Sequence, residues 1–266
     1  MTNAQVHRTD LERIAARLSD RDWSLLHWLR QHRYATTDQL RRASFVDHAN
    51  LAAATHACVR VLGRLATQRI LTRLERRVGG ARRGSAGYIW CLDTIGDRLT
   101  RSDDGPRRRI QEPSLAFLQH TLAVTETRVQ MQEAARAGTF LLNTVQVETE
   151  AWREYVTPSG ARSILKPDLM VTISSDAYDD HWYIEVDLGT ESLPVLLRKC
   201  RAYEDYRRTG RAQDEHGVFP RVLWVLTSPA RVGRLKAAIA ADASLPDRLF
   251  TGITPDALIA TLRDPP

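Results

Sequence analysis

Apolar residues in the first hundred positions recur with the spacing of short helices and then with that of strands. Three segments, in which apolar residues return about every 3.6 positions, are predicted to be helices: 19–31, 38–43 and 51–68. Apolar alternation predicts two strands, at 70–74 and 88–92. The positions between these strands, 78–87, are rich in glycine and arginine, which indicates an exposed loop.

Three short helices followed by a hairpin with a basic, glycine-rich tip form the order of a winged helix-turn-helix domain, here expected over 19–99. The third helix is expected to enter the major groove of DNA, and the loop to act as a wing with Arg82 and Arg83 on phosphates or in the minor groove. The side chains expected to contact DNA from the third helix are Asn50, Thr55, His56 and Arg60. The alternative is that the helix and hairpin form a homodimer interface and that the arginines are solvated.

The pattern changes after a polar segment, 100–112, in which Gly105 and Pro106 break any helix and which is predicted to be a linker. A long helix is expected over 114–137, before Gly138. Strands are then expected at 140–149, 165–173, 182–188 and 221–226, with a short edge strand at 249–250, and helices at 193–208, 229–241 and 256–262. This succession predicts an α/β domain of αβββαβ order over 113–266.

The composition favours a nucleic-acid partner, because 38 basic residues exceed 32 acidic ones and leave a net charge of +6. Only three of the basic residues are lysines, at 166, 199 and 236, so a lysine within a site stands out. Three widely spaced cysteines without a CxxC pair exclude a zinc finger and a disulfide framework. The polar N-terminus and the lack of a long apolar run predict a cytoplasmic protein with no membrane partner.

Three acidic residues occupy particular places in the predicted sheet of the second domain. Asp168 follows Pro167 at the start of one strand, and Glu185 and Asp187 lie two residues apart on the next, so they share a face. If the two strands pair, these carboxylates come together at one sheet edge. They would then offer the oxygen ligands that Mg²⁺ or Mn²⁺ requires, and such an ion would polarise a phosphodiester and activate a water. The alternative is that each carboxylate pairs with an arginine.

The sequences Pro167-Asp168 and Glu185-Val186-Asp187, within the αβββαβ order, resemble the PD-(D/E)XK nuclease superfamily. The resemblance implies that Asp168 and Glu185 bind a metal ion. It fails where Asp187 replaces the usual lysine, which puts catalysis in doubt and makes Asp187 a further metal ligand.

Some members of this superfamily recruit a lysine from the following helix, and Lys199 is expected on that helix. Glu126 resembles an extra acidic metal ligand that other members carry. The remaining polar residues nearby are given structural roles: Glu191 as an acid favoured by the helix dipole, Thr190 as its cap, and Tyr203 as a packing residue.

The chain as a whole resembles the replication-relaxation family of plasmids and integrated mobile elements over about 23–227. The motifs that carry this resemblance lie at 60–65, 69–71, 82–88, 96, 120–124, 166–168, 185–191 and 199–203. It implies a protein that acts on double-stranded DNA in replication, mobilisation or DNA processing, together with other plasmid replication or mobilisation proteins. A magnesium-dependent endonuclease or nickase is one reading. The alternative is a non-enzymatic regulator of transcription or replication whose second domain is a degenerate nuclease-like scaffold.

Overall fold

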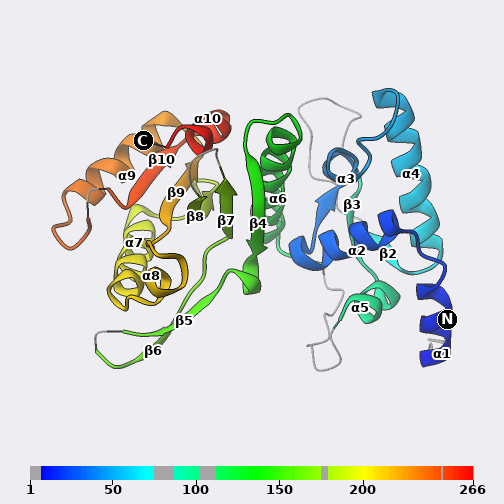
Figure 1. Cartoon of the computed structure of the whole chain (residues 1–266), viewed down its shortest axis with the longest axis horizontal. Coiled ribbons are helices and arrows are strands. Elements are labelled where there is room, and N and C mark those ends of the chain that lie inside the picture. Colours follow the sequence, from blue (N-terminus) through cyan, green and yellow to red (C-terminus); the bar gives the residue numbers. More distant parts are fainter. Residues whose placement is uncertain are drawn as a thin grey trace. The chain divides into compact units, whose positions relative to one another are not determined.

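The computed structural model describes residues 7–74, 87–101, 112–157, 159–174, 179–246 and 248–265. The fold is mixed α/β, as predicted, and the chain divides into two compact units, Met1–Val129 and Gln130–Pro266. The division falls within the long helix α6 (Leu115–Arg136), drawn in green in Figure 1. The predicted linker lies for the most part in 102–111, outside the described residues. Among the described helices, none combines the length and the hydrophobicity that crossing a bilayer requires.

The first unit consists mainly of short helices with a small sheet. Its elements before α6 are α1 (Arg8–Ala15), α2 (Asp20–His32), β1 (Ala35–Thr36), α3 (Thr37–Ser44), α4 (Leu51–Thr67), β2 (Leu71–Arg73), β3 (Ile89–Leu92) and α5 (Thr94–Thr100). The predicted helices correspond to α2, α3 and α4, and the predicted strands to β2 and β3. Strand β1 was not predicted, because two residues are too few to show an alternation. It pairs with β3, which also pairs with β2, in antiparallel fashion.

Local capping explains where the helices of the first unit begin. Ser19 and Asp22 form a reciprocal capping box at the start of α2, and Thr36 and Gln39 form another at the start of α3. The side chain of Asn50 caps α4 by accepting a hydrogen bond from the backbone N–H of Ala53 at 2.9 Å. The apolar faces that follow these caps pack into one core, which includes Leu25, Leu29, Leu40, Leu62 and Leu65.

The predicted wing falls largely on residues 75–86, outside the described part of the chain, and so do Arg82 and Arg83. The strands on either side of this segment are joined by side chains as well as by the ladder. The guanidinium of Arg73 on β2 lies 4.4 Å from the ring centroid of Tyr88, next to β3.

The second unit is built on a five-stranded sheet in the order β10-β9-β8-β7-β4. Its elements after α6 are β4 (Leu141–Val147), η1 (Glu148–Glu150), β5 (Arg153–Val156), β6 (Arg162–Leu165), β7 (Leu169–Ser174), β8 (Asp179–Asp187), α7 (Leu193–Arg208), α8 (Arg211–His216), β9 (Arg221–Leu226), α9 (Pro229–Ala240), β10 (Phe250–Ile253), η2 (Pro255–Ala257) and α10 (Leu258–Arg263). Strands β4, β7 and β8 are antiparallel neighbours, whereas β8, β9 and β10 run parallel. Each parallel step is made through a helix, α7 or α9.

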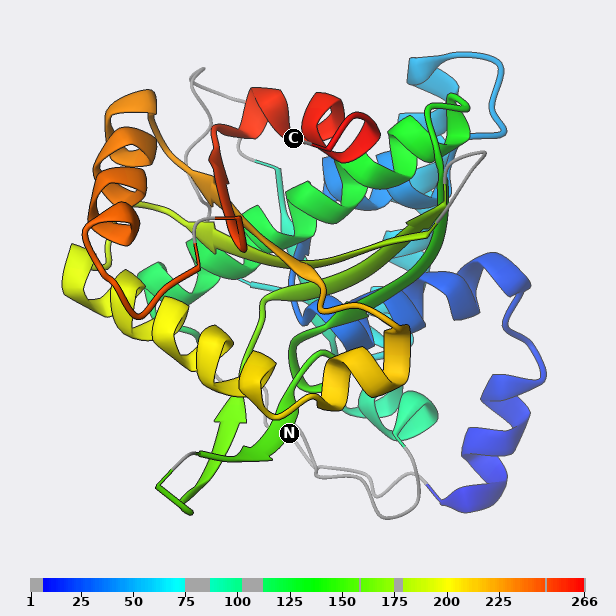
Figure 2. The same cartoon turned by 60° about the vertical axis from the view of Figure 1, so that its left-hand side comes forward.

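Helices α7 and α9 pack against each other and against the same face of the sheet, as the yellow and orange helices of Figure 2 show. The core of this layer includes Tyr183 and Trp224 from the sheet, Leu196 and Tyr203 from α7, and Leu235 from α9. Strands β5 and β6 form a separate hairpin between β4 and β7. The observed order is therefore the predicted one with this hairpin inserted, and the edge strand expected at 249–250 corresponds to β10, beside β9.

Candidate functional site

Glu185, on β8, is the centre of a buried polar cluster in the second unit. Only 2% of its surface is exposed. Its Oε1 accepts a hydrogen bond of 2.6 Å from the hydroxyl of Tyr203, and its Oε2 lies 3.4 Å from Nζ of Lys199. Lys199 and Tyr203 are one turn apart on α7, so both side chains reach the same strand. Lys199 therefore contacts Glu185, the acidic residue near which the nuclease resemblance places a lysine.

Asp168 joins this cluster because it stands where the pairing of β7 with β8 stops. The ladder between the two strands ends with Leu169 opposite Ile184. Just beyond that pair, Oδ2 of Asp168 accepts a hydrogen bond of 2.8 Å from the backbone N–H of Val186. This bond holds Asp168 beside Glu185, at the edge of the sheet where β8 ends. In sheets with parallel strands, the carboxyl ends of the strands are the usual place for a ligand.

The charges of the cluster act strongly on one another because the groups are poorly hydrated. Burial and the charge of Asp168 raise the pKa of Glu185 to about 7, against the opposing effect of Lys199 and Tyr203. Burial alone would lower the pKa of Lys199, but the carboxylates of Glu185, Asp168 and Glu191 raise it above its ordinary value. The cluster therefore contains a lasting ammonium group and a carboxyl group that titrates near neutral pH.

Glu191 also belongs to this cluster, which the sequence analysis did not foresee. Its Oε2 lies 3.5 Å from Nζ of Lys199. The predicted cap at Thr190 is wrong, because the N-cap of α7 is Ser192 and Pro194 occupies the first turn. Glu191 therefore precedes the helix, where its carboxylate can turn back toward Lys199.

Asp187 shares the face of Glu185, as strand alternation predicts, but it has a partner of its own. Its Oδ2 pairs with Nε of Arg231 on α9, and its Oδ1 accepts a 3.1 Å hydrogen bond from the N–H of Gly189. Arg231 also donates a 2.6 Å hydrogen bond to the backbone carbonyl of Glu191. Asp187 thus forms a buried ion pair that fixes the loop between β8 and α7.

The predicted set of metal ligands is not assembled as one group. Glu126 lies in the first unit, where its Oε1 is 2.6 Å from Nη1 of Arg42 and its Oε2 accepts a 3.2 Å hydrogen bond from Gln39. Across the described residues, no three His, Cys, Asp or Glu side chains are grouped so that they could hold a metal ion. The structure brings together Asp168, Glu185 and Lys199, and it pairs Asp187 and Glu126 with arginines.

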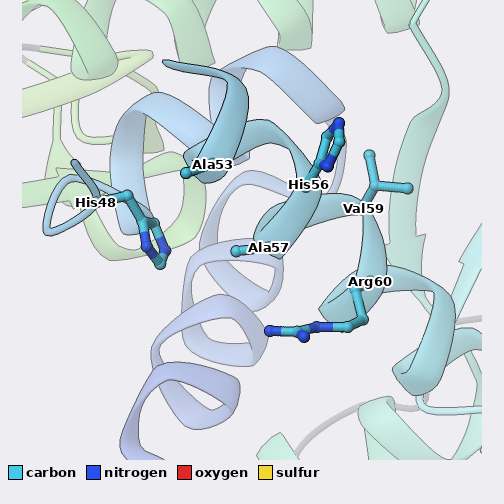
Figure 3. A pocket seen from close by; sticks show the side chains of 6 residues that line it. All are labelled: His48, Ala53, His56, Ala57, Val59 and Arg60. Carbon is cyan, nitrogen blue, oxygen red and sulfur yellow. The ribbon is translucent and has the colours of Figure 1, made fainter. Parts of the chain in front are cut away.

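The predicted DNA-contacting residues of α4 fall into two kinds. Asn50 is used in capping, and the hydroxyl of Thr55 donates a 2.7 Å hydrogen bond to the carbonyl of Leu51 within the helix. His56 and Arg60 are exposed and line an open hollow of about 660 Å³ together with His48, Ala53, Ala57 and Val59. Figure 3 shows the side chain of Arg60 extending toward the side of the helix on which His48 lies. Among the predicted DNA-contacting residues, His56 and Arg60 therefore present exposed nitrogen-bearing side chains on α4.

The fold and this site define an α/β protein with a carboxylate and lysine cluster at one edge of its sheet. The model of the replication-relaxation family matches residues 26–222, most of the chain, and the protein belongs to this family. The matched span contains α4 as well as Asp168, Glu185 and Lys199. A comparison with curated proteins finds no match. Membership of the family indicates a role in plasmid or mobile-element replication or relaxation, and an interaction with DNA in general.

Proposed function

We propose that the protein processes plasmid or mobile-element DNA, with the first unit binding duplex DNA and the second acting on a phosphodiester at Asp168, Glu185 and Lys199. The observation that carries this proposal is the contact between Lys199 and Glu185, 3.4 Å apart, in the electrostatic field of Asp168. Lys199, on α7, supplies the positive charge that is missing at position 187, where Asp187 replaces the usual lysine of the motif.

The exposure of the three groups suits a polyanionic substrate. The side chain of Lys199 is 36% exposed, and Asp168 is partly exposed, whereas Glu185 is buried behind them. A phosphate approaching the cluster meets the ammonium of Lys199, which would stabilise charge that develops on its oxygens. Tyr203 and Lys199 each hold one oxygen of Glu185, so its carboxylate is oriented before a substrate arrives.

The donor set is compatible with a magnesium ion, although it is smaller than the sequence predicted. Mg²⁺ is commonly held by one or two carboxylates, while waters and substrate phosphate oxygens complete its shell. Asp168 and Glu185 would be those carboxylates, and their mutual repulsion is expressed in the raised pKa of Glu185. When bound, the ion would polarise the phosphodiester and activate a water.

In the first unit, we assign DNA binding to the exposed face of α4 in a winged-helix arrangement. The support is the order α2, β1, α3, α4, β2, β3 and the exposure of His56 and Arg60. Asn50 and Thr55 each hydrogen-bond to the backbone of α4, so we assign the main base or phosphate contacts to His56 and Arg60. Replacing Arg60 by alanine is expected to weaken duplex binding and to reduce the slope of log affinity against log salt by about 1. Arg8→Ala, on the exposed start of α1, is the control.

Cleavage is tested by incubating supercoiled plasmid with the protein and Mg²⁺ or Mn²⁺. We expect nicking or linearisation that falls at least about a hundredfold in Lys199→Met and Asp168→Asn, by analogy with the loss of one transition-state charge partner. Asparagine at 168 still offers an oxygen to the N–H of Val186, so the strand end is kept. Arg198→Met, at the exposed neighbouring position on α7, should cleave like the wild type.

The alternative function is a DNA-binding regulator without enzymatic activity. It is favoured by the pairing of Asp187 with Arg231, and by the absence of a three-carboxylate group among the described residues. Duplex binding unchanged by EDTA, without cleavage of any DNA form in Mg²⁺ or Mn²⁺, would establish this alternative and overturn the proposed phosphodiester chemistry.

A further inference from the structure

A cavity lies in the second unit, between helix α9 and the strands β9 and β10, which are drawn in orange to red in Figure 1. Its volume is about 590 Å³, within the range of about 300–1,000 Å³ that is usual for small-molecule sites. Phe250 on β10 supplies a partly exposed ring to its lining, which also includes the buried Trp224 on β9. Apolar side chains of α9 complete the interior: Val232, Leu235 and Ile239.

The charged residues in the described part of the lining are all basic. Arg221 opens β9, Lys236 lies on α9, and Arg248 precedes β10. Lys236 and Arg248 are exposed, and the guanidinium of Arg221 lies 5.6 Å from the ring centroid of Trp182. Among the described residues that line the cavity there is no aspartate or glutamate. An apolar interior with a cationic margin complements a ligand that joins a flat, apolar body to a strongly negative group.

This cavity is separate from the cluster around Glu185, although Trp224 borders both. The ring of Trp224 lines the cavity, and its centroid lies 5.8 Å from Nζ of Lys199. Asp168, Glu185 and Lys199 are not part of the cavity lining. The two sites can therefore be altered independently.

We propose that this cavity binds a nucleotide, with the base at Phe250 and the apolar side chains of α9, and with the phosphates at the exposed Lys236 and Arg248. The partly exposed ring of Phe250 favours a planar base over an acyl chain because ring faces stack. Two exposed cations, Lys236 and Arg248, match a di- or triphosphate better than a single carboxylate. The inference stands without the proposed cleavage activity.

The test is isothermal titration of the full-length protein with ATP, with adenosine and with tripolyphosphate. ATP is expected to bind at about one per chain, and each fragment at least about tenfold more weakly, because base and phosphates contact different parts of the cavity. Reversing two charges in the variant Lys236→Glu/Arg248→Glu should weaken ATP binding by at least about tenfold. Arg234→Glu reverses one charge in the same way, on α9 but outside the lining. This control variant should bind ATP as the wild type does.

A second variant tests the apolar interior. Ala240 is exposed at the end of α9 and lines the cavity, so Ala240→Trp should fill the space without disturbing the core. We expect it to abolish ATP binding while leaving the thermal unfolding transition in place. Tripolyphosphate binding as tightly as ATP would reduce the cavity to an anion site and overturn the proposal. Binding of decanoate but not ATP, or of none of the probes, would also overturn it.

Discussion

Tyr203 donates a hydrogen bond of 2.6 Å to Oε1 of Glu185 from a side chain that is completely buried. Burial, and then the neighbouring charge of Glu185, raise the pKa of the Tyr203 hydroxyl well above its ordinary value. The hydroxyl therefore keeps its proton and remains a donor. The carboxylate of Glu185 is consequently held from two directions, by a neutral donor on one oxygen and by the ammonium of Lys199 on the other.

Removing the Tyr203 hydroxyl should cost stability. A hydrogen bond to a charged group contributes roughly 1.5–3 kcal/mol, and Tyr203→Phe is expected to lower the free energy of unfolding by that amount near pH 8. Urea denaturation measures it. The control is Tyr155→Phe, whose hydroxyl donates a long 3.4 Å bond to the carbonyl of Ala202 and should matter less. Equal losses in the two variants would contradict the assigned role of Tyr203.

The stability of the protein should depend on pH through Glu185. Its pKa is raised in the folded state to about 7 from an ordinary value of 4.5, so the folded state retains a proton that the unfolded state releases between these values. The contribution of Glu185 to stability therefore falls as the pH rises through this window, by roughly 3 kcal/mol in total, and is constant above it. In Glu185→Gln this fall should be missing. Parallel stability curves for the two proteins, measured by urea denaturation, would show that the pKa is not raised.

Breaking the Asp187–Arg231 pair should destabilise the fold strongly. Both side chains are largely buried, and removing one partner of a buried pair typically costs about 3–5 kcal/mol. We expect Asp187→Ala to show this loss in urea denaturation. Asp264→Ala breaks a pair with Arg263 whose two side chains are 70% and 58% exposed, and it should cost less than about 1 kcal/mol.

A second substitution at Asp187 distinguishes a structural role of this residue from a metal-binding role. In Asp187→Asn, one carboxamide oxygen can still accept a hydrogen bond from Arg231, so much of the fold stability should remain. Under the proposed function this variant keeps metal-dependent plasmid cleavage, whereas Asp168→Asn loses it. Loss of cleavage in a fully folded Asp187→Asn protein would return Asp187 to the set of metal ligands.

Two glycines of the first unit should respond to alanine in opposite directions. A Cβ at Gly96 would lie 2.2 Å from the backbone oxygen of Ile70, so Gly96→Ala must displace main chain, and a loss of about 1–3 kcal/mol is expected. A Cβ at Gly63, within α4, meets nothing within 4 Å. Gly63→Ala should therefore stabilise the protein by about 1 kcal/mol through helix propensity. Thermal unfolding distinguishes the two, and a gain for Gly96→Ala would contradict the close approach.

Much of the fold was predictable because the signals are local. Periodicity located α2, α3 and α4 in the first unit and the strands and helices that carry the polar cluster in the second. The predictions that were wrong concern features that hydrophobic periodicity does not report. The cap of α7 is Ser192 and not Thr190, because Pro194 favours a helix start just before it. The role of Tyr203 had a detectable signal, its spacing of four residues from Lys199, but the sequence-based prediction made Tyr203 a packing residue.

The sequence by itself determined that Glu185 and Asp187 share a face and that Asp168 begins the neighbouring strand, because strand geometry alternates side chains regardless of context. Only the tertiary structure decided which cation meets each carboxylate. Glu185 contacts Lys199 across 14 positions, Asp187 contacts Arg231 across 44, and Glu126 contacts Arg42 across 84. These pairings depend on how helices pack on the sheet and on one another, and no local period encodes that packing.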